Sequence, residues 1–174
     1  MKRFGYILAM LFGLLFVGSA CSDDDDDNTL EVDEVWKAQN EDAFAAQAQN
    51  PEFQKLESQS GAGYILYKVL KQGESTEQIY WNSQVEVYYK GTLIDGTVFD
   101  DGSFEHGASA VFAPSGVVDG FGTALQHMHP GDRWEIWIPQ QMGYGSTGST
   151  AGAVTIKPYT TLIFDLEVVK VVDP

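Results

Sequence analysis

The chain has 174 residues, which is enough for one domain of ordinary size with short additional segments. Its formal net charge is -15, and since residues 1–20 contain two basic residues and no acid, the remainder carries -17. This excess of negative charge argues against nucleic acid as a partner and excludes electrostatic attraction as the means of binding an anionic membrane.

Residues 1–20 have the layout of a secretory signal peptide. Lys2 and Arg3 are followed by an apolar run over 4–17 and by three small residues. The run is short for a transmembrane helix, which needs about 20 apolar residues. Cys21, the only cysteine, follows directly, and the segment VGSAC resembles the signal of bacterial lipoproteins, although a glycine stands where leucine is usual. That resemblance implies cleavage before Cys21 and lipidation of its sulfur, with an uncleaved anchor or plain secretion as alternatives.

Residues 21–29 are predicted to form an acidic tether. Five adjacent aspartates repel one another and stay extended in water, which favours a spacer between membrane and domain. The run is also similar to the surface-export signal of lipoproteins in one group of Gram-negative bacteria, whereas a calcium site lacks any implied turn geometry. These resemblances imply a protein of the cell envelope, lipid-anchored to the outer membrane on its periplasmic side or at the cell surface.

Residues 30–60 are predicted to form a helical arm. Val32, Val35 and Trp36 recur at helical spacing, and Phe44 continues this thin apolar stripe. Asn50-Pro51 interrupts the pattern, so we expect two short helices or one kinked helix, with the proline opening the second part. The arm is expected to pack on the main domain, to pair with a second copy in a dimer, or to act as a stalk.

From residue 61 to residue 174 the hydrophobic period changes to two, which indicates strands. Alternating segments occupy 64–73, 84–100, 131–139 and 160–171, and Asp95-Gly96 predicts a hairpin turn inside the second of them. Between them, Phe121 begins an i, i+3, i+4, i+7 apolar pattern, with Asp119 as its expected cap and Pro130-Gly131 as its end. One short helix against one antiparallel sheet predicts an α+β domain.

Reactive groups are scarce in this domain. The chain has no glycine-rich phosphate loop, no nucleophile elbow and no paired metal spacing. His127 and His129 would face different sides of a helix, and His106 is isolated. We therefore predict no metal site and no cofactor.

A set of aromatic and aliphatic residues at the edges of the predicted elements suits either a core or a pocket. Phe99 stands beside the charge of Asp100 at a strand end, and two valines at 117–118 precede Phe121 at the start of the helix. Tyr144 lies in the glycine-rich segment QQMGYGSTGST, which predicts a mobile loop in which a core role is least natural. These features favour a pocket.

At these residues the sequence resembles the FKBP-type peptidyl-prolyl isomerases. The segments VYYKGTLIDGTVFDDG, FAPSGVVDGFGTALQHMHPGDRWEIWIP, MGYGSTG and IKPYTTLIFDLEVVKV are similar to four successive blocks of that family, over about residues 64 to 172. The resemblance implies an antiparallel sheet of five to six strands wrapped around one short helix, here preceded by the helical arm. It also implies a cleft that binds X-Pro peptide segments.

The resemblance also implies which residues form the site. It assigns catalytic roles to Tyr89, Phe99, Asp100, Tyr144 and Phe164, and substrate binding to Phe112, Val117, Val118, Phe121 and Ile156. The Tyr144 hydroxyl would bond the carbonyl of the bound peptide. The chain departs from the family pattern at Phe121, which replaces a tryptophan, and lacks the arginine that usually accompanies Asp100. Ala110 stands near a usual apolar wall position, and the loop after Tyr144 is longer, over 149–153.

The resulting hypothesis is a lipid-anchored prolyl isomerase that assists the folding of extracytoplasmic proteins. Turning a prolyl bond needs no nucleophile, metal or cofactor, because no bond to the enzyme is made. The alternative is a non-catalytic module that binds proline-containing segments as a chaperone or surface adaptor. A third hypothesis is a structural envelope protein that assembles through residues 30–58.

Overall fold

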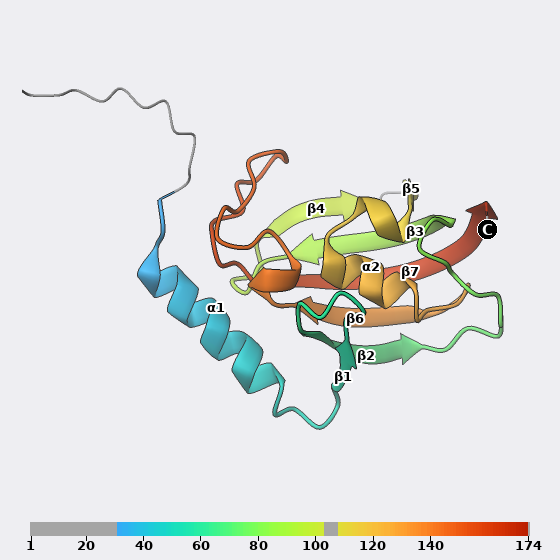
Figure 1. The fold of residues 1–174 in the computed structure, drawn as a ribbon, viewed down its shortest axis with the longest axis horizontal. Helices are drawn as coiled ribbons and strands as arrows, with labels where there is room; N and C mark the ends of the chain where they lie inside the picture. Colours follow the sequence, from blue (N-terminus) through green and yellow to red (C-terminus); the bar gives the residue numbers. More distant parts are fainter. Residues whose placement is uncertain (1–30, 103–107, 174) are drawn as a thin grey trace, which may run out of the picture.

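The computed structural model describes residues 31–102 and 108–173 (Figure 1). Its elements, in chain order, are α1 (Glu34–Gln47), β1 (Gln54–Glu57), β2 (Tyr64–Lys71), β3 (Gln84–Thr92), β4 (Val98–Gly102), β5 (Ala110–Phe112), η1 (Pro114–Gly116), α2 (Asp119–Leu125), β6 (Arg133–Ile138), η2 (Gln140–Met142) and β7 (Leu162–Asp173). The predictions for the signal peptide, for Cys21, for the acidic tether over 21–29 and for His106 lie outside the described residues.

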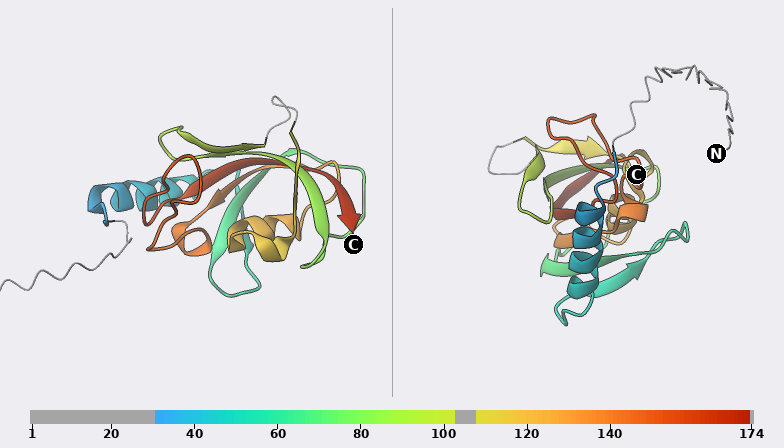
Figure 2. Two further views of the ribbon diagram at one scale, coloured as in Figure 1. Left: turned by 90° about the horizontal axis from the view of Figure 1, so that it is seen from above. Right: turned by 90° about the vertical axis from the view of Figure 1, so that its left-hand side faces the viewer.

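The strands form one antiparallel sheet in the order β1-β2-β6-β7-β3-β4. Strand β5 pairs with residues 85–87 of β3, the part of β3 that does not pair with β4. The described residues therefore contain seven strands rather than five or six, because the short strands β1 and β5 add to the expected set. The sheet arches over α2, as the left view of Figure 2 shows, and α1 lies beyond one end of it. The predicted α+β fold, a sheet wrapped around one short helix, is confirmed.

The alternation of the strands explains which face of the sheet is buried. In β6, Trp134, Ile136 and Ile138 are buried while the residues between them are partly exposed, and β7 repeats the pattern from Leu162 to Val168. The hairpin at Asp95-Gly96 is confirmed: Gly96 has φ +84°, a conformation that favours glycine, and the Asp95 carboxylate accepts a hydrogen bond from Thr97 N–H at 2.9 Å. The alternation of apolar and polar residues thus predicts both where the strands lie and which face of the sheet packs against α2.

Helix α2 is almost entirely enclosed by the sheet, and every residue from Gly120 to Leu125 is buried. The expected cap is wrong: the N-cap is Val118, and Asp119 lies in the first turn. Its carboxylate accepts hydrogen bonds from the hydroxyls of Ser58 (2.9 Å) and Ser60 (2.7 Å) in the β1–β2 turn. These two serines, distant in sequence, both bind the carboxylate, which therefore does not cap the helix. The helix ends at Leu125, before the expected end at Pro130-Gly131.

The predicted helical arm is only partly correct. Its first half is the single helix α1, capped by the Asp33 carboxylate, which accepts a hydrogen bond from Trp36 N–H at 3.0 Å. After Pro51 the chain forms β1 instead of a second helix, and β1 pairs with β2. The open hydrogen-bonding edge of β2 decides this outcome, because tertiary pairing overrides the helix propensity of a short segment. The sheet therefore begins at residue 54, not after residue 60.

Asp132 ties the turn before β6 to the end of β2. Its side chain is fully buried and accepts hydrogen bonds from the backbone N–H groups of Gly73 (2.6 Å) and His129 (2.8 Å). A buried carboxylate is stable when backbone donors satisfy it in this way.

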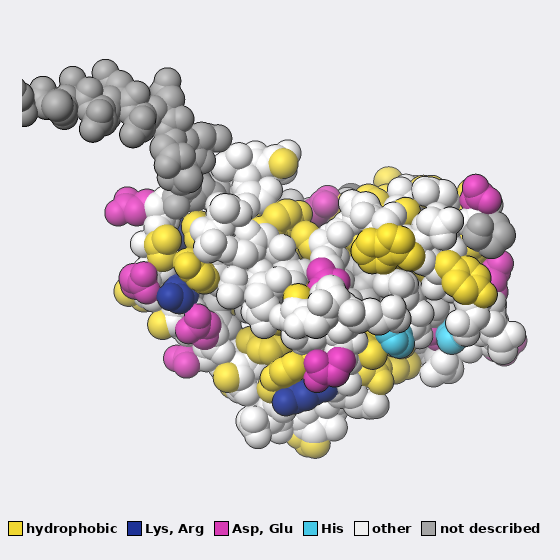
Figure 3. All heavy atoms as spheres, in the orientation of Figure 1, with side chains coloured by type: hydrophobic (Ala, Val, Ile, Leu, Met, Phe, Trp, Pro, Cys, Tyr) yellow, Lys and Arg dark blue, Asp and Glu magenta, His cyan; other side chains and the backbone are white. Residues whose placement is uncertain are grey.

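Acidic side chains are spread over the face shown in Figure 3, and basic side chains are few there, in keeping with the net charge. Over 31–102 and 108–173, no helix has both the length and the apolar character that crossing a membrane requires.

Candidate functional site

A cleft of about 310 Å³ opens between α2, the β3–β4 ribbon, β7 and the loop that follows η2. Ten residues line it: Tyr89, Phe99, Asp100, Phe112, Gly116, Val117, Val118, Phe121, Tyr144 and Phe164. All residues of the predicted site except Ile156 are among them, and Gly116 is the one that sequence reasoning missed. A glycine carries no chemical signal in the sequence, so only its place in η1 reveals it.

The floor of the cleft is a set of aromatic rings packed edge to face. The Phe121 ring meets Phe164 with centroids 5.0 Å apart at 81°, and Phe164 meets Phe99 at 5.4 Å and 83°. Tyr89 contacts Phe121 at 6.2 Å and 88°. Such edge-to-face contacts hold the rings in fixed orientations. Phe121 and Phe164 are only 4 % and 6 % exposed, so they form the base, while Phe99 is partly open to solvent.

Two glycines of the hairpin allow this packing. A Cβ at Gly91 would lie 2.6 Å from Phe99 Cζ and 2.9 Å from Phe164 Cε1. A Cβ at Gly102 would lie 2.6 Å from Tyr89 Cε1. Both positions bring aromatic rings against bare backbone, which no other residue allows without displacement.

The polar groups of the cleft are two tyrosine hydroxyls and one carboxylate. Burial and a hydrogen bond with Asp100 raise the pKa of Tyr89 well above its ordinary value. Burial, together with the negative charge of Asp100, also raises the pKa of Tyr144. Both hydroxyls therefore keep their protons at neutral pH and remain hydrogen-bond donors. The lining residues include no Lys, Arg or His.

The loop that carries Tyr144 is held by backbone hydrogen bonds. Gly145 has φ +60° and its N–H donates to Gln140 O at 2.9 Å, while Gly148, with φ +67°, donates to Tyr144 O at 3.1 Å. Ser149 and Ile156 exchange two backbone hydrogen bonds of 2.8 Å. The glycines thus provide a tight turn around Tyr144, whose side chain is 38 % exposed at the rim of the cleft.

Ile156 lines a neighbouring cavity of about 400 Å³ instead of the cleft. The cavity shares Phe99, Asp100 and Tyr144 with the cleft, and its far wall is formed by Ser149 and by residues 151–154. The predicted loop extension over 149–153 is therefore next to the site. Ala110, expected near a wall, pairs with Val87 in the sheet and does not line the cleft.

The chemistry available here is that of an apolar slot with donors at its rim. Aromatic walls can hold a compact apolar ring, and a tyrosine hydroxyl can donate to a carbonyl of the same ligand. Within the described part of the chain, no group of His, Cys, Asp and Glu is arranged to hold a metal ion.

Residues 75–169 match the sequence profile of a family described as FKBP-type peptidyl-prolyl cis-trans isomerase. Among curated relatives, the chain is 42% identical over 107 residues to the FKBP-type 22 kDa peptidyl-prolyl cis-trans isomerase of Escherichia coli (strain K12), covering 62% of this chain and 50% of the relative. It is 38% identical over 109 residues to the Outer membrane protein MIP of Legionella longbeachae, covering 62% of this chain and 44% of that relative.

The fold is also similar to a crystal structure of a peptidyl-prolyl cis-trans isomerase from Pseudomonas syringae pv. tomato str. DC3000. The TM-score is 0.67 at 29% sequence identity, and the match covers 81% of this chain and 98% of that one. This chain spans about half the length of the curated relatives that it matches.

Proposed function

Because the chain belongs to the FKBP-type peptidyl-prolyl cis-trans isomerase family, we propose that it isomerises X-Pro bonds in exported proteins. The observation that supports this most directly is the cleft itself, in which aromatic rings enclose an apolar slot beside the Tyr144 side chain. A proline ring fits such a slot by its size and its lack of an N–H donor.

The reaction needs only that the twisted amide bind more tightly than the planar one. The uncatalysed barrier is about 18–20 kcal/mol, because rotation interrupts amide resonance. A twisted amide is less dipolar than a planar one, so the apolar walls formed by Tyr89, Phe99, Phe121 and Phe164 favour it. Interactions that strengthen in the transition state raise the rate, whereas equal binding of both states does not.

Tyr144 and Asp100 have different roles in this mechanism. The Tyr144 hydroxyl, kept protonated by its raised pKa, donates a hydrogen bond to a carbonyl of the bound peptide. Asp100 orients the Tyr89 hydroxyl by hydrogen bonding and transfers no proton. Val117, Val118 and the other lining residues hold the chain on either side of the proline.

A second candidate function is a non-catalytic module that binds proline-containing segments. Phe121 favours it, because phenylalanine is smaller than the tryptophan usual in the family and has no indole N–H to offer the ligand. The absence of an arginine from the lining residues beside Asp100 favours it as well. In this case the cleft would bind peptides without accelerating isomerisation.

A protease-coupled assay with a proline peptide distinguishes the two functions. We expect the wild-type chain to accelerate isomerisation and the double variant Phe99→Ala, Tyr144→Phe to lose most of that rate. Tyr80→Phe is the matched control, since Tyr80 is exposed and lies outside the cleft. Wild-type activity no better than the double variant's rules out catalysis, and peptide binding without rate enhancement selects the binding module.

The proposed site of action is the cell envelope, with the chain anchored through a lipid on Cys21. The lipoprotein-like segment VGSAC supports the anchor, and a relative named as an outer membrane protein supports the compartment. Acyl chains contribute about 0.8 kcal/mol per buried CH₂, which offsets the repulsion between an acidic chain and anionic lipids. We expect Cys21→Ser to move the full chain from the membrane fraction to the soluble one; an unchanged distribution contradicts the anchor.

Self-association through the arm is a further proposal. Val35 is 68 % exposed on α1, and a second copy would cover it. Residues 54–57 belong to the sheet, so deletion of the whole arm is not a clean test. We therefore compare the solution mass of the wild type with that of Val35→Glu; equal monomeric masses contradict a dimer through α1.

A further inference from the structure

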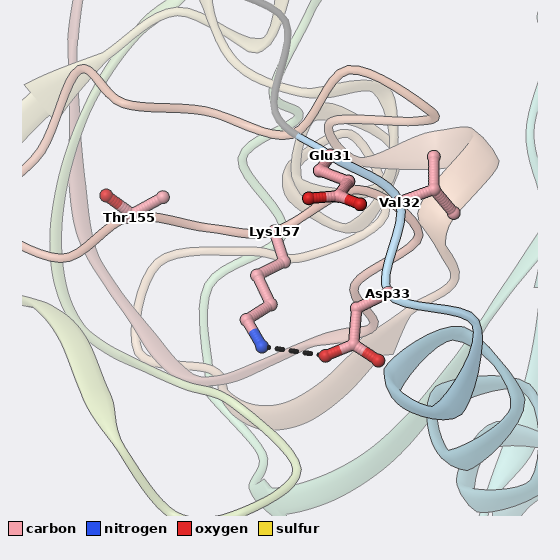
Figure 4. A pocket seen from close by; sticks show the side chains of 5 residues that line it. All are labelled: Glu31, Val32, Asp33, Thr155 and Lys157. Carbon is pink, nitrogen blue, oxygen red and sulfur yellow. Dashed lines mark hydrogen bonds and ion pairs between the residues drawn. The ribbon is translucent and has the colours of Figure 1, made fainter.

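Besides the ring contact of Phe44 with Tyr64 of β2, helix α1 contacts residues 157–161, the segment that connects the Tyr144 loop to β7. At the start of the helix, Lys157 Nζ lies 2.9 Å from an oxygen of Asp33, as Figure 4 shows, beside a hollow lined also by Glu31, Val32 and Thr155. One turn later, Trp36 Nε1 donates a hydrogen bond to Thr160 Oγ1 at 2.8 Å. The Thr160 hydroxyl itself donates to Lys157 O at 2.7 Å. Residues at the start of α1 thus contact both Lys157 and Thr160 of this segment.

Asn40 is the buried part of the same contact, with 1 % of its surface exposed. Its Oδ1 accepts a hydrogen bond from Thr161 N–H at 2.8 Å, and its backbone oxygen accepts one from Thr161 Oγ1 at 3.3 Å. Its Nδ2 donates to Trp36 O at 2.8 Å. A buried amide that uses its donor and acceptor atoms in this way fixes the position of the backbone it contacts.

The segment held by α1 contains a strained residue. Tyr159 has φ +60°, and it is the only residue other than glycine with positive φ among the described residues. Such a conformation persists only where surrounding contacts impose it, and it often marks a functional site. Lys37 Nζ, on α1, lies 4.5 Å from the centre of the Tyr159 ring. The helix therefore contacts Tyr159 directly as well as its neighbours.

Tyr159 in turn supports the turn that presents Tyr144. Its N–H donates a hydrogen bond of 2.8 Å to Gly145 O, and Gly145 follows Tyr144 in the chain. The Ser149–Ile156 bridge closes the other side of the loop just before residue 157. A continuous set of contacts therefore runs from α1 through residues 157–161 to the residue next to Tyr144.

We propose that α1 is a positioning element of the cleft, and that Asn40 and Trp36 act by fixing, through residues 157–161, the place of the Tyr144 side chain. This proposal rests on the proposed function. None of the α1 residues lines the cleft, so they are positioning residues rather than catalytic ones. A displacement of about 1 Å in a group that contacts the reacting bond can lower a rate by up to 10²-fold.

The test is a double-mutant cycle between Asn40→Ala and Tyr144→Phe, assayed at a temperature where all variants are folded. In the wild-type background we expect Asn40→Ala to lower kcat/KM by about five- to fifty-fold, mainly through kcat. In the Tyr144→Phe background the same change should lower it by less than about two-fold, because the group being positioned is already absent. Gln39→Ala is the matched control, since Gln39 is its exposed neighbour on α1.

An effect that does not act through Tyr144 predicts a different result: Asn40→Ala would then lower kcat/KM by equal factors in both backgrounds. That result, or an effect no larger than that of Gln39→Ala, overturns the proposal. If Asn40→Ala does not fold, Lys37→Gln provides the same cycle, because it removes the contact with the Tyr159 ring and, apart from that, only an ion pair with the exposed Glu34 at 3.8 Å. If the wild type has no isomerase activity, the proposed function fails, and the same cycle is read from the affinity for a proline peptide.

Discussion

Replacement of Gly91 by alanine tests whether the packing of the cleft walls determines activity. Gly91 lies on β3 opposite Phe164 of β7, and a Cβ there would lie 2.6 and 2.8 Å from Phe99 Cζ and Cε2 and 2.9 Å from Phe164 Cε1. Carbon atoms in ordinary contact are about 3.5–4.0 Å apart, so the rings must move by about 1 Å. Phe164 is buried, whereas Phe99 is partly exposed, so we expect Phe99 to shift toward the cleft.

Two opposing terms set the expected change in stability. Overpacking a filled core destabilises by about 1–3 kcal/mol. Alanine in a strand is in turn more favourable than glycine by about 0.5–1 kcal/mol, because the unfolded chain has less freedom to lose. The net loss is about 0.5–2 kcal/mol, which lowers Tm by a few degrees, at about 2–4 °C per kcal/mol. A wall residue displaced by about 1 Å should lower kcat/KM by ten- to a hundred-fold.

Isomerisation rates and calorimetric Tm values for Gly91→Ala and Gly116→Ala check this reasoning. Gly116 also lines the cleft, but a Cβ there has no heavy atom within 4 Å, so Gly116→Ala should keep the wild-type Tm. Wild-type kcat/KM in Gly91→Ala refutes the reasoning, and so does an equal loss of Tm in both variants.

Three further predictions concern protonation and buried polar contacts. The raised pKa of Tyr144, caused by burial and by the charge of Asp100, means that the folded protein holds this proton more tightly than the unfolded chain. Its contribution to stability is complete below about pH 10 and is lost as pH rises through the folded-state value. We therefore expect kcat/KM to stay constant from about pH 7 to pH 9.5. A fall in kcat/KM that follows the rise of phenolate absorbance within that range contradicts this prediction. Asp132→Ala leaves two backbone N–H groups without their buried acceptor and should lower the free energy of unfolding by about 2–5 kcal/mol in denaturant titration. Asp119→Ala removes the acceptor of two serine hydroxyls and should lower the free energy of unfolding by about 1–2 kcal/mol. If either aspartate variant loses no more stability than Asp42→Ala, a change at an exposed aspartate, the prediction for that variant is contradicted.

Local patterns were sufficient for much of the fold, and the family resemblance named residues that lie together in the structure. Strands β2, β3, β6 and β7 follow from period-two alternation, and the β3–β4 turn follows from Asp95-Gly96, because these signals depend on neighbours in the chain. The resemblance and the places at element edges point to the aromatic residues at 99 and 121 and to the tyrosine at 144, and the structure brings these residues to one cleft.

The misses have one cause. We expected residues 54–57 to be helical and Asp119 to cap α2, but the main contact of each lies outside its own local pattern. Residues 54–57 pair with the next strand, and Asp119 binds two serines far away in the chain. Neither β2 as the partner of β1 nor the serine hydroxyls at 58 and 60 can be inferred from the local pattern. Ile156 lines the adjacent cavity rather than the cleft, because the Ser149–Ile156 bridge sets its position, and its role in substrate binding stays a prediction.

What the sequence by itself determined is most of the elements, the face of each that is buried, and the residue types that line the proposed prolyl site. These properties depend on the periodicity of apolar side chains and on turn residues, which act over a few positions. Only the tertiary structure decided that α1 docks on residues 157–161 and that Gly91 lies under the rings of Phe99 and Phe164. Such contacts arise from packing between distant segments, where distances of a few tenths of an ångström decide what fits.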